Sequence, residues 1–234
     1  MKISNAIRHV ILDAGGVICY ARMGSWRTTV RFEEIIAPAR LATADPARIA
    51  AAMEASAQAY IDESLPIADE NMEFALRRNY FLDLAKRLDW VLTDREADAL
   101  ARDMTENDAR YDFYPDTRAG LARLGARGGL HLLSNAMPSL KRVLANAGLI
   151  ELFDEVMIST DEGLAKPDPA IYRAMLARIG EKPDACAFVD DRVENLEAAR
   201  ALGIRAVHMA RGEKSDWDGE VARDLFEVAR LLGR

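Results

Sequence analysis

The sequence predicts an α/β protein, a doubly wound parallel sheet that carries an inserted all-helical cap domain. Three observations lead to this fold class. A short apolar run at 10–12 has the length and the branched residues of a buried strand. Residues 20–109 then show helix patterns and no convincing strand. From Tyr111 onward strand and helix patterns alternate, which indicates a parallel sheet with helices on both faces.

The first predicted strand ends at a candidate functional residue. Its apolar run stops at Asp13, and Gly15 and Gly16 follow, so the backbone there can turn sharply and approach a ligand closely. Open α/β sheets place their chemistry at the carboxyl ends of strands. Asp13 is therefore a candidate for chemistry, although a carboxylate at this point could also only cap a turn.

The insertion is expected to be a bundle of helices over residues 20–109. Asp45, followed by a proline, has the pattern of an N-cap that opens one helix. Thr93 and Glu96 have the spacing of a capping box that opens another. Between them, Pro66 is expected to open a long helix. The buried stripe of that helix is predicted to contain Met72, Ala75, Leu76, Phe81, Leu84, Ala85 and Leu88.

The rest of the chain is expected to complete the sheet and its covering helices. Strands are predicted at 130–133, 155–158, 185–189 and 205–209, and helices at 116–126, 138–147, 169–179, 193–202 and 220–232. Glycines that follow several of these helices are typical of helix ends. The predicted division is a core of residues 1–19 and 110–234, with the cap over 20–109.

Composition and charge narrow the class of partner. The formal net charge is −7 and the pI is about 5.1, which argues against nucleic acid or an anionic membrane as the main partner. Met1 to Arg8 lack the apolar stretch of a signal peptide, and no apolar run is long enough to span a membrane. Cys19 and Cys186 are expected to be buried, reduced thiols, so a cytoplasmic location is predicted.

Polar residues also follow the other predicted strands. They are Ser134 and Asn135 after one strand, Lys166 in the loop after another, and Asp190 and Asp191 after a third. Because the carboxyl ends of parallel strands lie along one edge, we expect these residues to converge with Asp13. Each has a plainer reading as well, as an N-cap or an ordinary loop charge.

The convergent residues have the chemistry of a phosphoryl-binding site. Three carboxylates held together would repel, and one would be protonated unless a cation lay among them. A divalent ion with oxygen ligands, of which Mg²⁺ fits best, removes this conflict. Lys166 adds a fixed positive charge, and the Ser134 hydroxyl and nearby backbone N–H groups add donors. This set could hold the phosphoryl group of a small phosphorylated metabolite while Asp13 attacks phosphorus.

The order of these motifs resembles the haloacid dehalogenase (HAD) superfamily, which consists mostly of phosphatases. Asp-Ala-Gly-Gly-Val at 13–17 is similar to the first motif and Leu-Leu-Ser-Asn at 132–135 to the second. Gly-Leu-Ala-Lys-Pro-Asp-Pro at 163–169 and Phe-Val-Asp-Asp-Arg at 188–192 look like the third and fourth. The resemblance covers essentially the whole chain and implies a Rossmann-like core with a helical cap between the first two motifs.

The resemblance also implies a role for each site residue. The implied catalytic residues are Asp13 as nucleophile, Ser134 and Lys166; the implied substrate-binding residues are Gly16, Ser134, Asn135 and Lys166; the implied Mg²⁺ ligands are Asp13, the carbonyl of Gly15, Asp190 and Asp191. At Gly15 the chain departs from the family, whose phosphatases usually carry a second aspartate there that protonates the leaving group. Such general acid help is commonly worth ~10²–10⁴-fold in rate. A family subset with a similar Asp-x-Gly motif is still associated with phosphatase activity, including on sugar phosphates.

The leading hypothesis is therefore a Mg²⁺-dependent phosphatase that cleaves a small phosphomonoester, with sugar phosphates among the candidates. A 2-haloacid dehalogenase also lacks the second aspartate but needs no metal. Phosphonate cleavage would need Lys86, the lysine of the predicted cap. A weakly catalytic binding or regulatory protein would keep the site without turnover. Specificity is expected to come from the cap, where Arg22, Trp26, Arg27 and Arg31 are candidates, and no oligomeric state is predicted.

Overall fold

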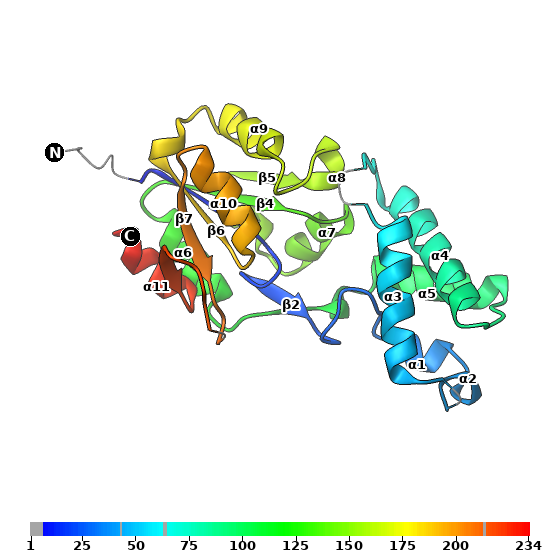
Figure 1. The fold of residues 1–234 in the computed structure, drawn as a ribbon. Coiled ribbons are helices and arrows are strands. Elements are labelled where there is room, and N and C mark those ends of the chain that lie inside the picture. The colour runs from blue at the N-terminus through cyan, green and yellow to red at the C-terminus, as the bar shows by residue number, and fades with distance from the viewer. Residues whose placement is uncertain (1–6, 43, 63–64, 213) are drawn as a thin grey trace.

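A computed structural model of the chain describes residues 7–42, 44–62, 65–212 and 214–234 (Figure 1). Its main sheet contains β1 (His9–Leu12), β4 (Gly129–Ser134), β5 (Glu155–Ile158), β6 (Cys186–Asp190), β7 (Arg205–Met209) and β8 (Glu220–Ala222). The strands run parallel in the order β5-β4-β1-β6-β7-β8. The strand order reverses between β1 and β6, which is where open α/β sheets bind their ligands.

The register of the three central strands brings their ends together. Leu12 of β1 lies opposite Leu132 of β4 and Val189 of β6. The backbone N–H of Asp13 donates to the Val189 carbonyl at 2.9 Å, so Asp13 sits immediately beyond this row. The next residues on all three strands therefore meet at one edge of the sheet.

Helices cover both faces of the sheet (Figure 1). One face packs against α6 (Thr117–Gly125), α7 (Ser139–Asn146) and α11 (Leu225–Leu231), and the other packs against α9 (Pro169–Ile179) and α10 (Val193–Ala201). Val10 and Leu12 belong to the first apolar core and Ile11 to the second, because side chains alternate along a strand. This arrangement confirms the predicted doubly wound parallel sheet. The short elements η2 (Ile150–Leu152), α8 (Ser159–Glu162) and η3 (Pro183–Ala185) connect the larger ones.

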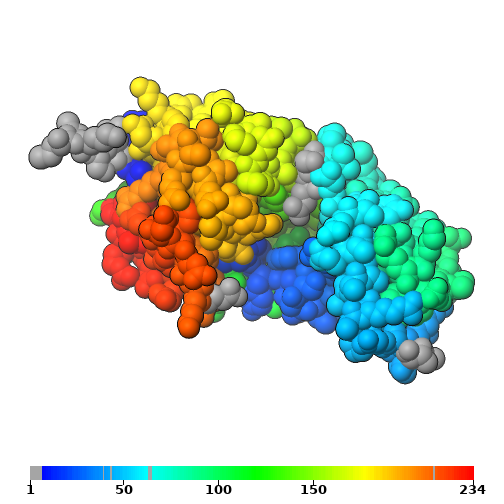
Figure 2. Space-filling model, viewed as in Figure 1, coloured from blue at the N-terminus to red at the C-terminus, as the bar shows by residue number. Residues whose placement is uncertain are grey.

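A group of helices interrupts the chain after β1 and forms the cap, which lies to one side of the sheet in Figures 1 and 2. Its helices are α1 (Phe32–Ile35), α2 (Pro38–Ala42), α3 (Pro46–Tyr60), α4 (Glu70–Arg87) and α5 (Asp94–Glu106), and η1 (Asp108–Arg110) follows them. Tyr80, Phe81 and Leu100 are among the residues of its separate apolar core. The predicted Asp45 N-cap opens α3, and the predicted capping box of Thr93 and Glu96 opens α5.

The start of α4 differs from the prediction. The helix begins at Glu70, where the Asp69 side chain caps it, and not at Pro66. Met72 is 46% exposed and Ala75 is also exposed, although both were expected in the buried stripe. The first turns of α4 instead bury two charged residues, Glu73 and Arg77. An apolar stripe cannot reveal charged residues that are buried through polar contacts.

Short strands were also missed. β2 (Cys19–Ala21) pairs antiparallel with β3 (Tyr111–Phe113), although no strand was expected within 20–109. β8 occupies the start of the helix expected over 220–232, and α11 begins only after Asp224, whose side chain accepts from the Glu227 N–H. Each of these strands has three residues, which is too few to show an alternating pattern.

Two other expectations concern location. Among the helices of the described ranges, none combines the length and the apolar character that crossing a membrane requires. Cys19 and Cys186 are buried free thiols, as predicted. The expectation for Met1 to Arg8 falls mostly on residues 1–6, which lie outside the described residues.

Candidate active site

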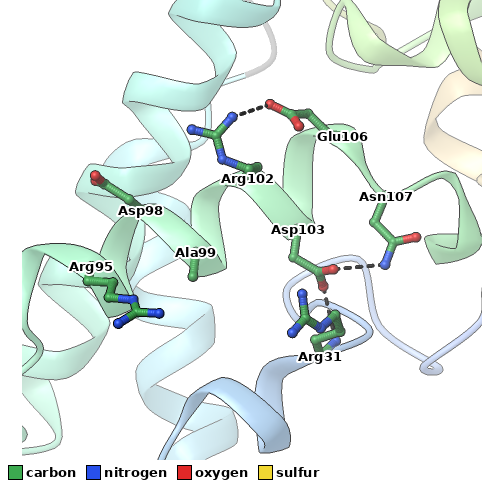
Figure 3. Close-up of a pocket in the computed structure, with 8 residues that line it drawn as sticks. All are labelled: Arg31, Arg95, Asp98, Ala99, Arg102, Asp103, Glu106 and Asn107. Carbon is green, nitrogen blue, oxygen red and sulfur yellow. Dashed lines mark hydrogen bonds and ion pairs between the residues drawn. The ribbon is translucent and has the colours of Figure 1, made fainter.

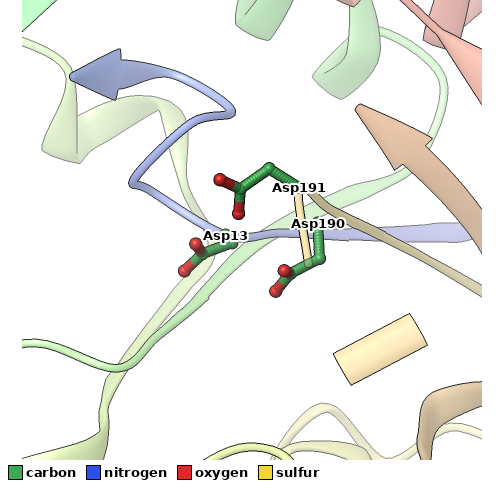
Figure 4. A group of neighbouring side chains, drawn as sticks. All are labelled: Asp13, Asp190 and Asp191. Atoms are coloured by element: carbon green, nitrogen blue, oxygen red, sulfur yellow. The ribbon is translucent and has the colours of Figure 1, made fainter. Parts of the chain in front are cut away.

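Three carboxylates meet beyond the ends of β1 and β6 (Figure 4). Asp13 follows β1, Asp190 ends β6, and Asp191 comes next in the chain. One oxygen from each lies within 4.8 Å of the others, which is close enough for the three to share one metal ion. Ser134 ends β4 and is buried close to the Asp13 carboxylate, whose pKa its side chain helps to lower. The convergence expected from the strand ends is therefore present.

Lys166 completes this group from the loop before α9. Its Nζ lies 2.8 Å from Asp13 Oδ1 and 2.7 Å from Asp190 Oδ2, and its side chain is almost fully buried. Burial alone would lower the pKa of Lys166, but the two carboxylates outweigh it and raise that pKa. The lysine is therefore held in its charged form.

Asn135 fixes the loop that carries Lys166. Its amide nitrogen donates to the Lys166 carbonyl at 2.9 Å, and its amide oxygen accepts from the Lys166 N–H at 2.8 Å. Asn135 was expected near the substrate, and it does line the cavity described below. Its polar atoms, however, are engaged in positioning the lysine.

Asp190 and Asp191 have different surroundings. Asp190 is fully buried and accepts hydrogen bonds from the Asn195 side chain at 3.0 and 3.1 Å and from the Arg192 N–H at 2.8 Å. Asp191 is the more exposed of the two. Burial of its carboxyl group, together with the charges of Asp13 and Asp190, raises the pKa of Asp191 to about 7. The sequence analysis did not single out Asn195 as a site residue. Its place four residues after Asp191, near the start of α10, could have indicated that its side chain reaches the carboxylates.

The site carries more negative charge than its lysine can balance. Burial and the neighbouring Asp190 raise the pKa of Asp13, while Lys166 opposes this shift. Oδ1 of Asp13 is buried and makes no hydrogen bond within the described part of the chain, although Lys166 forms its ion pair there. Three carboxylates around a single lysine form a donor set that suits a hard divalent cation.

The two glycines after Asp13 have different structural requirements. Gly16 has φ +68°, and a Cβ there would lie 2.1 Å from Asp191 Oδ2, so this turn requires glycine. Gly15 has no left-handed backbone, and a Cβ there would meet only the Trp26 ring at an ordinary 3.8 Å. The absence of a side chain at Gly15 is therefore not imposed by the backbone.

A cavity of about 450 Å³ lies over these residues. From the sheet edge it is lined by Asp13, Gly15, Gly16, Ser134, Asn135, Lys166 and Asp191. From the cap side it is lined by Trp26, Arg27, Ala57, Gln58, Ile61, Arg77, Arg110 and Tyr111, the last of these at the start of β3. The cavity therefore lies between the cap and the sheet edge, with the carboxylates on one side.

The candidate specificity residues separate into two groups. Trp26 and Arg27 line the cavity. Arg22 is paired with Asp112 at 2.7 Å, and Arg31 is paired with Glu34 at 2.6 Å; neither lines it. Lys86 is exposed near the far end of α4 and is also not among the lining residues, so the structure gives no support to phosphonate cleavage.

A larger depression of about 680 Å³ lies on the outer side of α5 (Figure 3). Its charged side chains pair largely with one another or with close neighbours. Arg102 binds Glu106 at 2.8 Å, and Asn107 donates to Asp103 at 2.8 Å. The depression holds no group from the sheet edge, so its size alone does not make it the active site.

The fold and the site together define an α/β protein that holds a buried lysine among carboxylates at the point where the strand order reverses. A family profile described as haloacid dehalogenase-like hydrolase matches residues 7–203. The chain therefore belongs to the haloacid dehalogenase-like hydrolases, as its motifs had predicted.

Curated relatives with phosphatase names match part of the chain. It is 40% identical over 119 residues to a phosphoserine phosphatase of Thermus thermophilus, a match that covers 50% of this chain and 47% of that protein. It is 29% identical over 123 residues to a glyceraldehyde 3-phosphate phosphatase of Methanopyrus kandleri, covering 50% and 52%. The chain spans about half the length of the curated relatives it matches.

Solved structures match nearly the whole chain. The L-2-haloacid dehalogenase of Xanthobacter autotrophicus superposes with a TM-score of 0.66 and 20% identity, covering 97% of this chain and 98% of that one. A HAD phosphatase of Thermococcus onnurineus superposes with a TM-score of 0.60 and 19% identity, covering 97% and 98%. At these identities the likeness shows the shared fold.

Proposed function

We propose that this protein is a Mg²⁺-dependent phosphatase that cleaves a small phosphomonoester through an aspartyl-phosphate on Asp13. The observation that carries the proposal is the geometry around Asp13. A lysine Nζ lies 2.8 Å from one of its oxygens, and two further carboxylates lie within 4.8 Å. This arrangement would supply a nucleophile, a fixed cation and the oxygen ligands of a metal site at one edge of the sheet.

The residues present fit Mg²⁺. Asp13, Asp190 and Asp191, with the carbonyl of Gly15, would hold the ion. The excess of three carboxylates over one lysine supports this assignment. When bound, the ion would neutralise charge on the phosphoryl oxygens.

The remaining steps belong to the chain's own residues. A carboxylate oxygen of Asp13 would form a bond to phosphorus as the bond from phosphorus to the leaving oxygen breaks. Ser134 would hold the transferred phosphoryl group, and Lys166 would balance its charge. Gly16, expected to bind substrate as well, donates its backbone N–H to the Cys19 carbonyl at 2.8 Å, so this N–H is not available to the phosphoryl group. Water would then attack phosphorus of the aspartyl-phosphate, which releases inorganic phosphate and restores Asp13.

A second candidate is hydrolysis of a 2-haloacid. Two observations favour it. Gly15 has no side chain that could protonate an alkoxide leaving group, and the whole chain is similar in fold to L-2-haloacid dehalogenases. In that reaction Asp13 would attack carbon and expel halide. The two carboxylates of Asp190 and Asp191 have no evident use there, and the curated relatives bear phosphatase names. We therefore rank the phosphatase first.

One experiment separates the two candidates. The purified protein is assayed with para-nitrophenyl phosphate and with a chlorinated propionic acid, each with Mg²⁺ and with excess chelator. The proposal expects phosphate release only with Mg²⁺, and a hydroxylamine-labile adduct with the mass of one phosphoryl group at Asp13. Asp13→Asn, which keeps the size of the side chain, should abolish both. Full phosphatase activity in chelator, or halide release in place of phosphate release, would overturn the proposal.

We also propose a class of substrate and a cellular location. The substrate would be a small phosphorylated metabolite, because the cavity of about 450 Å³ has room only for a small molecule. The two buried free thiols support a cytoplasmic location.

A further inference from the structure

Two buried arginines face the cavity from the cap side. Arg77 comes from α4 and Arg110 from η1, and they are only 6% and 4% exposed. Both line the same cavity as Asp13. A buried guanidinium is costly unless hydrogen bonds and opposite charge compensate it. Their partners therefore indicate whether this charge is structural or is available to a ligand.

The contacts of these arginines leave charge uncompensated. Arg110 donates to the backbone carbonyls of Met104 and Trp26, which are neutral acceptors. Arg77 contacts one carboxylate, Glu73, at a long 3.4 Å, and its buried Nε has no hydrogen-bond partner among the described residues. Burial and the neighbouring charge of Arg77 lower the pKa of Arg110 to about 10, as expected where two cations lie close together.

The two nearby carboxylates, Glu73 and Asp103, also accept hydrogen bonds from neutral groups. Glu73 accepts from the N–H and the hydroxyl of Ser139, both at 3.0 Å. Asp103 accepts from Asn107 at 2.8 Å and from the Thr29 hydroxyl. Neither carboxylate lines the cavity, whereas both arginines do. On this side the cavity wall is therefore positively charged.

We propose that Arg77 and Arg110 bind a carboxylate of the substrate, while its phosphoryl group lies at Asp13. The substrate class is then the small phosphorylated carboxylic acids. Among the described residues Glu73 is the carboxylate in contact with Arg77, and Arg110 forms no ion pair, so an added carboxylate suits this wall of the cavity. Guanidinium groups also bind carboxylates through paired N–H donors. The inference rests on the proposed function for the placement of the phosphoryl end.

Binding of inert analogues tests the inference without turnover. Phosphonoacetate, phosphonopropionate and phosphonobutyrate carry a phosphonate and a carboxylate at increasing separation, and each has a neutral carboxamide counterpart. Calorimetry with the Mg²⁺-loaded protein gives the affinity ratio of acid to amide for each length. We expect at least one length at which the acid binds about tenfold or more tightly than its amide. A ratio near one at all three lengths would overturn the inference, and this result needs no variant.

Variants then locate the effect. Arg77→Met and Arg110→Met should each bring the ratio close to one, and Arg77→Lys should restore part of it because it keeps the charge and the contact with Glu73. Arg102→Met is the matched control, because Arg102 forms an exposed ion pair with Glu106 at the outer depression; it should leave the ratio unchanged. Preserved ratios in folded Arg77 and Arg110 variants would refute the assignment. If the unmodified protein does not hydrolyse para-nitrophenyl phosphate, that result counts against the proposed function instead. The affinity ratio of acid to amide can still be measured by calorimetry in that case.

Discussion

The substitution Gly15→Asp tests how the protein handles a poor leaving group. The backbone at Gly15 is not left-handed, and an added Cβ would lie 3.8 Å from Trp26 Nε1, an ordinary contact. An aspartate can therefore be introduced without strain at the turn. The adjacent Gly16 offers no such freedom, because a Cβ there would overlap Asp191 Oδ2 at 2.1 Å.

The size of the effect follows from what a positioned acid contributes. Without an acid at Gly15, the reaction must expel an unprotonated alkoxide, so the rate should fall steeply as the leaving group becomes more basic. Gly15→Asp should raise kcat/KM for alkyl phosphates by up to ~10²–10⁴-fold. It should change kcat/KM for para-nitrophenyl phosphate little, since nitrophenolate leaves readily without a proton.

The assay is a series of phosphate esters, with log kcat/KM plotted against leaving-group pKa for each protein. Gly15→Asn is the matched control, because asparagine has the same size but cannot donate a carboxyl proton. We expect a steep negative slope for the unmodified protein and for Gly15→Asn, and a shallower slope for Gly15→Asp. A flat plot for the unmodified protein, with chemistry rate-limiting, would show that another residue supplies the proton. Equal gains from asparagine and aspartate would equally refute the reasoning.

Three further substitutions test other parts of the structure. Asp191→Ala should abolish both Mg²⁺ binding in calorimetry and phosphate release; retained binding would place the metal elsewhere. Glu73→Gln should lower the free energy of unfolding in urea by on the order of 3 kcal/mol, because it leaves Arg77 buried without its carboxylate; a change below about 1 kcal/mol would contradict that contact. Burial and nearby His9 lower the pKa of His131 from 6.5 to about 4, so between these values the unfolded chain takes up a proton that the folded chain does not, and stability should fall as pH falls. His131→Gln should flatten this loss in urea titrations at several pH values, and an unchanged slope would remove His131 as its cause.

Much of the fold was predictable because its signals are local. Buried strands of the parallel sheet appear as short apolar runs, and polar residues such as Asp13 and Ser134 mark where each run ends. The sheet then brings these ends together whatever the intervening chain contains. The carboxylates and Lys166 could therefore be grouped from sequence alone.

The cap side of the cavity could not be predicted in this way. On α4 the buried positions near the cavity are Glu73 and Arg77, which look like surface charges in an amphipathic pattern, while Met72 looks buried and is exposed. Glu73 accepts two hydrogen bonds from Ser139 of α7, 66 residues away in sequence, and Arg77 is buried in contact with Glu73. Such pairings arise only when the cap meets the sheet, so no local pattern contains them.

The ribbon of β2 and β3 has a consequence for how the cap can vary. Ala21, which leads out of the sheet domain, lies opposite Tyr111, which leads back into it. Paired residues on antiparallel strands have Cα atoms only about 5 Å apart. The cap thus leaves and re-enters the sheet domain at neighbouring points, as a long loop between the two strands of a hairpin does. A segment of any length could connect these two points without moving a strand of the sheet. The helices that line the cavity from the cap side are therefore free to be exchanged while the residues at the sheet edge stay in place.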